Sequence, residues 1–136
     1  MRRSTRAFTL IELLLVMVIL AVLAGIAVPT YIGYAREAKI KATKAGLSNI
    51  STALHEFEVK FDRFPTNDEG LAALVTAPAA LPAWDHAFLA KMPVDAWGHA
   101  FLYRAPGIAH PESFDIGSLG PDEQPDTGDE ITQDDI

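Results

Sequence analysis

The longest apolar run of the chain, Phe8–Val28, constrains the fold more than any other feature. Glu12 is the only charged residue in it. At 1.5 Å of rise per residue, about 21 helical residues extend roughly 31 Å, which is the thickness of the hydrocarbon layer of a bilayer. The run therefore predicts one transmembrane helix near the N-terminus.

Glu12 is the unusual residue of this run. A charged side chain at the centre of a membrane helix costs about 2.5–3.5 kcal/mol, and less near the interface. One interpretation is an interfacial carboxylate that reaches the lipid headgroups and the positive end of the helix dipole. The other is a carboxylate that is neutralised by a cationic partner.

The residues around Glu12 carry a resemblance. A short basic leader ends at Ala7, and Ala7–Glu12 followed by an apolar helix resembles the class III signal of type IV pilins and type II secretion pseudopilins. The resemblance implies that a prepilin peptidase cuts between Ala7 and Phe8 and methylates the new N-terminus at Phe8. It also implies that Glu12 pairs with the N-terminal amine of a neighbouring subunit. Ala7 stands where the family usually has Gly.

Composition narrows the class of protein. The chain has 136 residues, no Cys and a net charge of −7, which becomes −10 without the three leader arginines. An acidic body of this kind argues against nucleic-acid binding. The absence of Cys excludes a disulfide, so we expect another device to stabilise a small extracytoplasmic domain. A secretory signal peptide is the rival for the N-terminus, but its apolar core would be shorter.

A second helical pattern follows the apolar run. Pro29 ends that run, and Gly33 lies one turn later. A one-sided apolar stripe then predicts that the helix continues, with a bend, to Phe61. We expect this stripe to pack against the following domain, and a coiled-coil seam is the second interpretation. The stripe consists of Ile40, Leu47, Ile50, Leu54, Phe57 and Phe61.

Weaker signals follow this helix. Thr66 and Glu69 form a capping-box pattern, which predicts a short helix from Asn67 to about Thr76. Residues 100–104 and 113–116 are typical of antiparallel strands, joined through a turn at Pro106 and Gly107. Beyond Gly117 the chain has little to bury, and the acids at its end, Asp134 and Asp135, are interpreted as a tail.

Three later motifs extend the resemblance over the whole chain from Phe8 to Ile131. Arg63–Leu71, Pro93–Gly98 and Ser118–Asp122 are similar to the corresponding motifs of the major pseudopilins of type II secretion, although Ala96 replaces a Pro. The fold that this implies is α+β and pilin-like: a long N-terminal helix packed on a short helix, loops and a small antiparallel sheet.

The resemblance also implies a domain organisation. Residues 1–7 are expected to be a cleaved leader, 8–34 a transmembrane and filament-core helix, and 35–136 a periplasmic globular domain. Within the last of these, residues 118–131 are expected to form a Ca²⁺-binding loop.

The acidic loop is the candidate metal site. Its crowded carboxylates suit a hard cation with six to eight oxygen ligands, although it lacks EF-hand spacing and a solvated acidic tail is the alternative. The resemblance implies a structural Ca²⁺, with Glu130 standing where Asp is usual and Glu123 replacing a Gly. The implied ligands are the Leu119 carbonyl, Asp122, the Gln124 carbonyl, Asp129 and Glu130.

Catalytic patterns were not found. Four scattered histidines do not form a dense zinc motif, and nucleophile-elbow and phosphate-loop motifs are absent from the sequence. We expect no enzyme.

The preferred hypothesis is a structural subunit of a helical filament that drives export of folded proteins. Phe8 and Glu12 would set the register of the subunits, and Pro29 and Gly33 would permit local unwinding. The expected partners are identical subunits, minor pseudopilins, an inner-membrane secretion platform and the prepilin peptidase, at the bacterial inner membrane. The alternatives are a minor pseudopilin, a type IV pilin subunit, or a monomeric signal-anchored periplasmic Ca²⁺-binding module.

Overall fold

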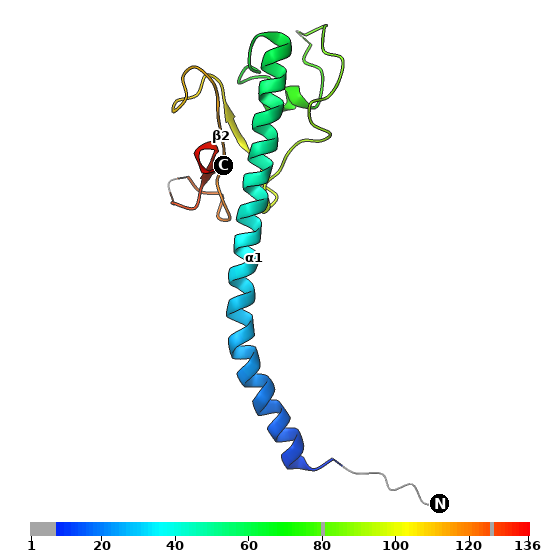
Figure 1. Ribbon diagram of the computed structural model, residues 1–136, viewed down its shortest axis with the longest axis vertical. Helices are drawn as coiled ribbons and strands as arrows, with labels where there is room; N and C mark the ends of the chain where they lie inside the picture. The colour runs from blue at the N-terminus through cyan, green and yellow to red at the C-terminus, as the bar shows by residue number, and fades with distance from the viewer. Residues whose placement is uncertain (1–7, 80, 126) are drawn as a thin grey trace, which may run out of the picture. The chain divides into compact units, whose positions relative to one another are not determined.

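The computed structural model describes residues 8–79, 81–125 and 127–136, and for Pro29 the backbone alone. The expected leader, residues 1–7, lies outside this part of the chain. By their contacts the residues divide into two units, Met1–Glu37 and Ala38–Ile136. The described residues form these elements in chain order: α1 (Leu10–Phe61), η1 (Gly70–Leu74), β1 (Leu102–Arg104), β2 (Asp115–Ser118), β3 (Ile131–Thr132) and η2 (Gln133–Asp135) (Figure 1).

The predicted long helix is confirmed as α1. It contains a stretch that is long and apolar enough to cross a membrane, and every side chain from Phe8 to Val28 is exposed. The backbone stays helical through Pro29 and Gly33. Exposure of so much contiguous apolar surface to water is unfavourable, so lipid or other protein must cover this part of the helix.

In the second unit, α1 carries the core of the domain. Leu47, Ile50, Leu54 and Phe57 have no exposed surface, whereas Ile40 and Phe61 are partly buried. Their spacing of three and four residues places them on one face of the helix. The predicted stripe is therefore a domain core and not a coiled-coil seam within the chain.

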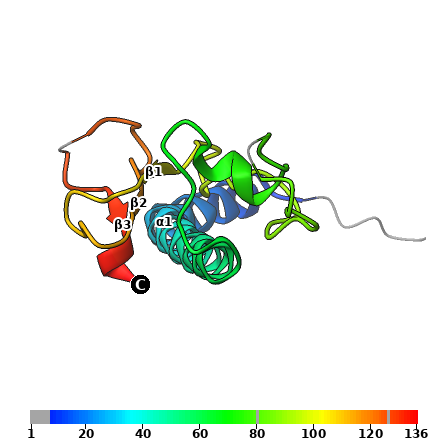
Figure 2. The ribbon, with the colours of Figure 1, turned by 90° about the horizontal axis from the view of Figure 1, so that it is seen from above.

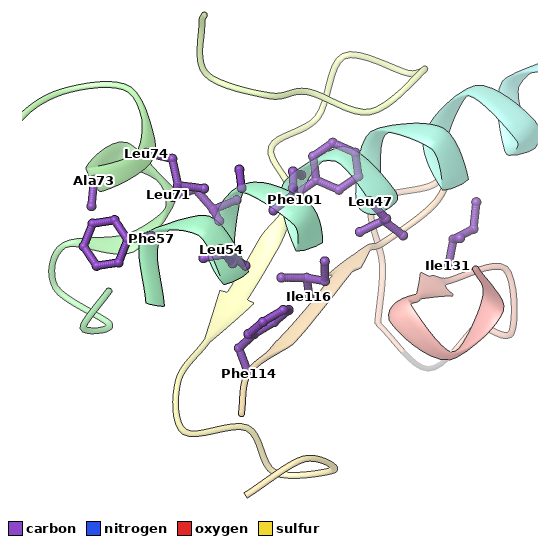
Figure 3. Packing of buried hydrophobic residues seen from close by; sticks show 12 residues of the cluster. Leu47, Leu54, Phe57, Leu71, Ala73, Leu74, Phe101, Phe114, Ile116 and Ile131 are labelled. Atoms are coloured by element: carbon purple, nitrogen blue, oxygen red, sulfur yellow. The ribbon is translucent and has the colours of Figure 1, made fainter. Parts of the chain in front are cut away.

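Two groups of residues cover this face. Seen along the helix, the strands lie on one side of the α1 segment and η1 on another (Figure 2). Leu71 and Leu74 approach Phe57 from η1, while Phe101, Phe114 and Ile116 pack near Leu54 and Leu47 from the sheet side (Figure 3). Gly46 permits a close approach of Phe101 to α1, because a Cβ at Gly46 would lie 3.1 Å from the Phe101 ring.

The sheet is antiparallel and has the order β1-β2-β3. Tyr103 pairs with Ile116, and Ser118 pairs with Ile131. The expected strand at 113–116 is wrong by two residues: β2 begins at Asp115, and Phe114 precedes it as a buried core residue. Gly117 has low strand propensity, but pairing with Leu102 on one side and with Thr132 on the other keeps it in the sheet.

The turn after α1 confirms the capping box. The Thr66 amide donates to Glu69 (2.8 Å), and the Glu69 amide donates to the Thr66 hydroxyl (3.2 Å). Arg63 also donates to both Glu69 carboxylate oxygens, at 2.7 and 2.8 Å. The helix expected over Asn67–Thr76 is shorter and tighter than expected, because a turn precedes the 3₁₀ helix η1 and Gly70 adopts a φ of +55°.

The interpretation of the C-terminal residues as an unpacked tail is wrong. Ile131 is buried and begins β3. Asp135 accepts a hydrogen bond from the Thr132 amide at 2.8 Å, and its carbonyl accepts one from Lys44 on α1 at 2.8 Å. Asp134 lies 3.4 Å from His110. These contacts join the C-terminal segment to the domain.

Phe57 provides a test of the core. Phe57→Ala removes a fully buried ring at the centre of the cluster, so it should lower the free energy of unfolding by about 3–5 kcal/mol. Denaturant unfolding of the detergent-solubilised full chain measures this. Val59→Ala is the matched control on the same helix, because Val59 is 87% exposed. Equal losses in the two variants would contradict the packing described here.

The Arg63–Glu69 pair provides a pH test. Hydrogen bonds from Arg63 outweigh the effect of burial and lower the pKa of Glu69 from 4.5 to about 2. Because the pKa is lowered by folding, the stabilisation is complete above pH 4.5 and is lost as the pH falls from 4.5 towards 2. Between pH 4.5 and 2 the melting temperature should therefore fall less with decreasing pH in Glu69→Gln than in the wild-type chain. An identical pH profile would show that the pair does not contribute.

Candidate functional site

Two regions contain the residues that the sequence singles out: the start of α1 and the acidic loop 118–131. At the start of α1, Phe8 lies just before the helix and is 76% exposed. Ala7, on the other side of the predicted cleavage point, lies outside the described residues. Glu12 occupies the first turn.

Glu12 forms a capping box with Thr9. One carboxylate oxygen of Glu12, Oε2, accepts hydrogen bonds from the Thr9 amide and the Thr9 hydroxyl, each at 3.2 Å. The Glu12 amide in turn donates to the Thr9 hydroxyl at 3.3 Å. Thr9 was missed in the sequence analysis, although a Thr followed three residues later by Glu before an apolar run is a capping signal.

The arrangement at Glu12 has a chemical consequence. Thr9 supplies two neutral donors to one carboxylate oxygen of Glu12, Oε2. In hydrocarbon a carboxylate favours a cationic partner, because the pairing neutralises a charge that hydrocarbon penalises. The site can therefore accept an ammonium group without losing its helix cap.

Pro29 and Gly33 lie together in the first unit. Both belong to the continuous helix, so the structure shows no unwound segment there. Around Gly33, no atom would lie within 4 Å of an added Cβ. Gly weakens a helix by about 1 kcal/mol relative to Ala, and Pro removes one backbone hydrogen bond, so the helix is intrinsically weakest here.

In the acidic loop, oxygen atoms converge on the hydroxyl of Thr127. Its Oγ1 lies 2.5 Å from Asp129 Oδ1, 3.3 Å from the Gln124 carbonyl and 3.5 Å from Asp122 Oδ1. Three of the five predicted ligand groups thus meet at one point. Thr127 was not singled out by the sequence analysis, which considered only acids and ligand carbonyls.

The other two predicted ligands are placed differently. Both carboxylate oxygens of Glu130 accept backbone amides, from Thr127 at 2.8 Å and from Gly128 at 2.9 Å. Leu119 is half-buried at the start of the loop. Among the residues that the structure describes, which exclude Asp126, no three His, Asp or Glu side chains form a metal-binding group. Main-chain carbonyls would therefore have to complete a site, and a donor set made only of oxygens fits Ca²⁺.

A buried carboxylate, Asp95, anchors the base of this loop. Its side chain has no exposed surface. Oδ2 accepts the Ser118 hydroxyl at 2.6 Å, and Oδ1 accepts the amides of Trp97 and His99 at 2.9 and 2.8 Å. Burial works against the charged form, but these hydrogen bonds outweigh it and hold the pKa of Asp95 below its ordinary value. Asp95 is therefore an ionised structural residue.

The 95–98 turn is also joined to α1. The Ala96 amide donates to the buried Thr43 hydroxyl at 3.2 Å, and Lys39 lies over the Trp97 ring. Trp84 donates its indole N–H to the Ala73 carbonyl at 3.1 Å. Both tryptophans therefore act as loop anchors.

Comparison with known proteins places these features in a family. The family model described as "Type II secretion system (T2SS), protein G" matches residues 30–136, and the prokaryotic N-terminal methylation motif matches residues 2–28. Together they contain both regions described above.

Individual relatives agree with this. The type II secretion system core protein G of Klebsiella pneumoniae is 38% identical over 133 residues, which cover 93% of this chain and 91% of that protein. The protein of the same name from Pseudomonas aeruginosa is 37% identical over 125 residues, covering 89% and 87%. The crystal structure of the major pseudopilin from enterohaemorrhagic Escherichia coli has a TM-score of 0.62 and 28% identity, and covers 74% of this chain and 90% of that one.

Proposed function

The chain belongs to the type II secretion system protein G family, and we propose that this major pseudopilin polymerises through its N-terminal helix into a filament that drives export of folded proteins. The observation that carries the proposal is the exposed apolar surface of the segment from Phe8 to Val28, most of which belongs to α1. A single chain cannot cover this surface. Lipid covers it before assembly, and the N-terminal helices of other subunits cover it afterwards.

The geometry of such a filament follows from the kind of interface. A contact between two different surfaces of identical subunits does not close on itself and produces an open helix. Glu12 sets the register, because its carboxylate pairs with the amine of Phe8 on a neighbouring subunit. Two charges that hydrocarbon would penalise thereby neutralise each other.

Processing comes before this pairing. A prepilin peptidase cuts between Ala7 and Phe8, and the methylation motif supports modification of the new N-terminus at Phe8. Without the cut there is no amine at Phe8. Pro29 and Gly33 then permit local unwinding as the helix leaves the lipid, which is supported by the weak helix propensity of this segment.

The proposed surroundings follow from the same membership. The protein is a membrane-anchored subunit of the secretion system, and its assembly involves other components of that system. We place the domain 35–136 in the periplasm, with the leader in the cytoplasm. Minor pseudopilins and the inner-membrane secretion platform are the expected partners besides identical subunits.

The acidic loop is proposed to hold Ca²⁺. The ligands would be the Leu119 carbonyl, Asp122, the Gln124 carbonyl, Asp129 and Glu130. The convergence of three of these groups on Thr127 supports the proposal. When bound, the cation would supply the cross-link that a chain without cysteines cannot obtain from a disulfide.

Substitution of Glu12 tests the filament. Glu12→Ala should abolish assembly while the protein still inserts into the membrane, because the apolar run remains. Glu12→Gln is the matched variant: its amide oxygen can still accept the Thr9 hydrogen bonds, but it has no charge for an amine. Filament recovery by shearing and membrane fractionation measure the two steps. Assembly of Glu12→Gln at the wild-type level would overturn the charge-pairing role and assign Glu12 to helix capping.

Removal of Ca²⁺ tests the loop. At a free cation concentration of about 100 times Kd, binding stabilises the folded state by about 2.7 kcal/mol, so chelation should lower the melting temperature by on the order of 10 °C. The detergent-solubilised full chain is melted with Ca²⁺, with Mg²⁺ and with a chelator. Asp122→Asn is the control, and it should show a much smaller Ca²⁺ effect. Equal melting temperatures of the wild type with Ca²⁺ and with chelator would refute the metal site.

A further inference from the structure

Ser118 lies buried between Asp95 and the first peptide of the acidic loop. It is 1% exposed. Its hydroxyl donates to Asp95 Oδ2 at 2.6 Å and accepts the Gly120 amide at 3.1 Å. An ionised carboxylate can only accept hydrogen bonds, so the hydroxyl proton must point to Asp95 and a lone pair of the oxygen must face Gly120. Asp95 thus sets the direction of both bonds.

The Gly120 amide, which donates to the Ser118 hydroxyl, belongs to the same peptide unit as the Leu119 carbonyl. This peptide is trans, since the Ala105–Pro106 bond is the one cis bond found in the described residues. In a planar trans peptide the N–H and C=O groups point in opposite directions. By holding the Gly120 amide, Ser118 therefore also sets the direction of the Leu119 carbonyl, which is a proposed Ca²⁺ ligand.

Gly120 is also confined by the far end of the loop. Its φ of +77° lies in the left-handed region, and a Cβ there would lie 2.6 Å from the Asp129 carbonyl oxygen. Its own carbonyl lies 3.3 Å from His99 Nδ1. Asp129, a proposed ligand at the far end of the loop, therefore lies beside Gly120, whose peptide unit contains the Leu119 carbonyl.

We propose that Asp95 and Ser118 are positioning residues for a hard divalent cation bound in the acidic loop. They aim the Leu119 carbonyl before the cation arrives and do not bind the cation themselves. Both Asp95 oxygens are occupied by protein donors, and its side chain has no exposed surface. This inference rests on the Ca²⁺ site proposed above.

The test removes one hydroxyl. Ser118→Ala breaks the link between Asp95 and Gly120 with little change in volume. Isothermal titration of the detergent-solubilised full chain with CaCl₂ should show a Kd that is raised tenfold or more, since residues that orient metal ligands typically contribute 10- to 100-fold. In the cation-free protein, amide hydrogen exchange over residues 119–131 should become faster.

Thr43→Val is the matched control. It also removes a buried hydroxyl, one that contacts the Ala96 amide and lies outside the loop. It should lower the melting temperature and leave the Kd for Ca²⁺ within about twofold of the wild-type value. An equal rise of Kd in both variants would assign the effect to general loosening and overturn the inference.

The remaining outcomes separate the two proposals. A wild-type chain that binds Ca²⁺ and a Ser118→Ala variant that binds it equally well would overturn the positioning role and leave the metal site intact. A wild-type chain with no heat of binding and no Ca²⁺-dependent melting would overturn both.

Discussion

The domain depends on one packing interaction, the apolar face of α1 between Leu47 and Phe57. Residues from η1, from the strands and from the C-terminal β3 all bury their side chains against this face. The sheet is too small to be stable alone, because its strands contain only two to four residues. The helix is therefore the element on which the other parts of the domain fold.

The same helix has a different task in its first half. From Leu10 to Val28 its side chains are exposed in the part of the chain that the structure describes. One continuous element thus carries the core of the domain and the surface that other molecules must cover. The apolar first half and the domain core therefore belong to one continuous helix. The segment around Pro29 and Gly33 is where the helix propensity is low.

The sequence predicted the helix and its core well, because their signals are local. A stripe of period 3.6 needs no tertiary information to be recognised, and the Thr66–Glu69 box joins residues three positions apart. The predicted strand was displaced from Asp115–Ser118 because Gly117 has low strand propensity and gives no local strand signal. The strand at Ile131 was missed because one apolar residue among acids makes no pattern. Pairing with Gly117 and Ser118 of β2 keeps this strand in the sheet.

The candidate site also contains some residues that local motifs predict and others that only the fold brings together. Glu12 was recognised from its motif. The capping box that Thr9 forms with Glu12 could have been predicted from the same residues, but it was overlooked. The Asp95–Ser118 bond joins residues that are 23 positions apart, and no local pattern predicts it. Likewise, the path of the loop brings the Thr127 hydroxyl close to three of the proposed ligand groups. Residue types near a site are visible in the sequence, but which of them orient the others depends on the fold.

The burial of Asp95 has a consequence for ionic strength. Mobile ions screen exposed charges over about 8–10 Å in physiological salt, but they hardly reach a carboxylate with no exposed surface that is balanced mainly by amide and hydroxyl dipoles. An exposed pair such as Lys44 and Asp135 weakens as salt is added. The base of the acidic loop therefore keeps its shape in dilute and in concentrated surroundings alike.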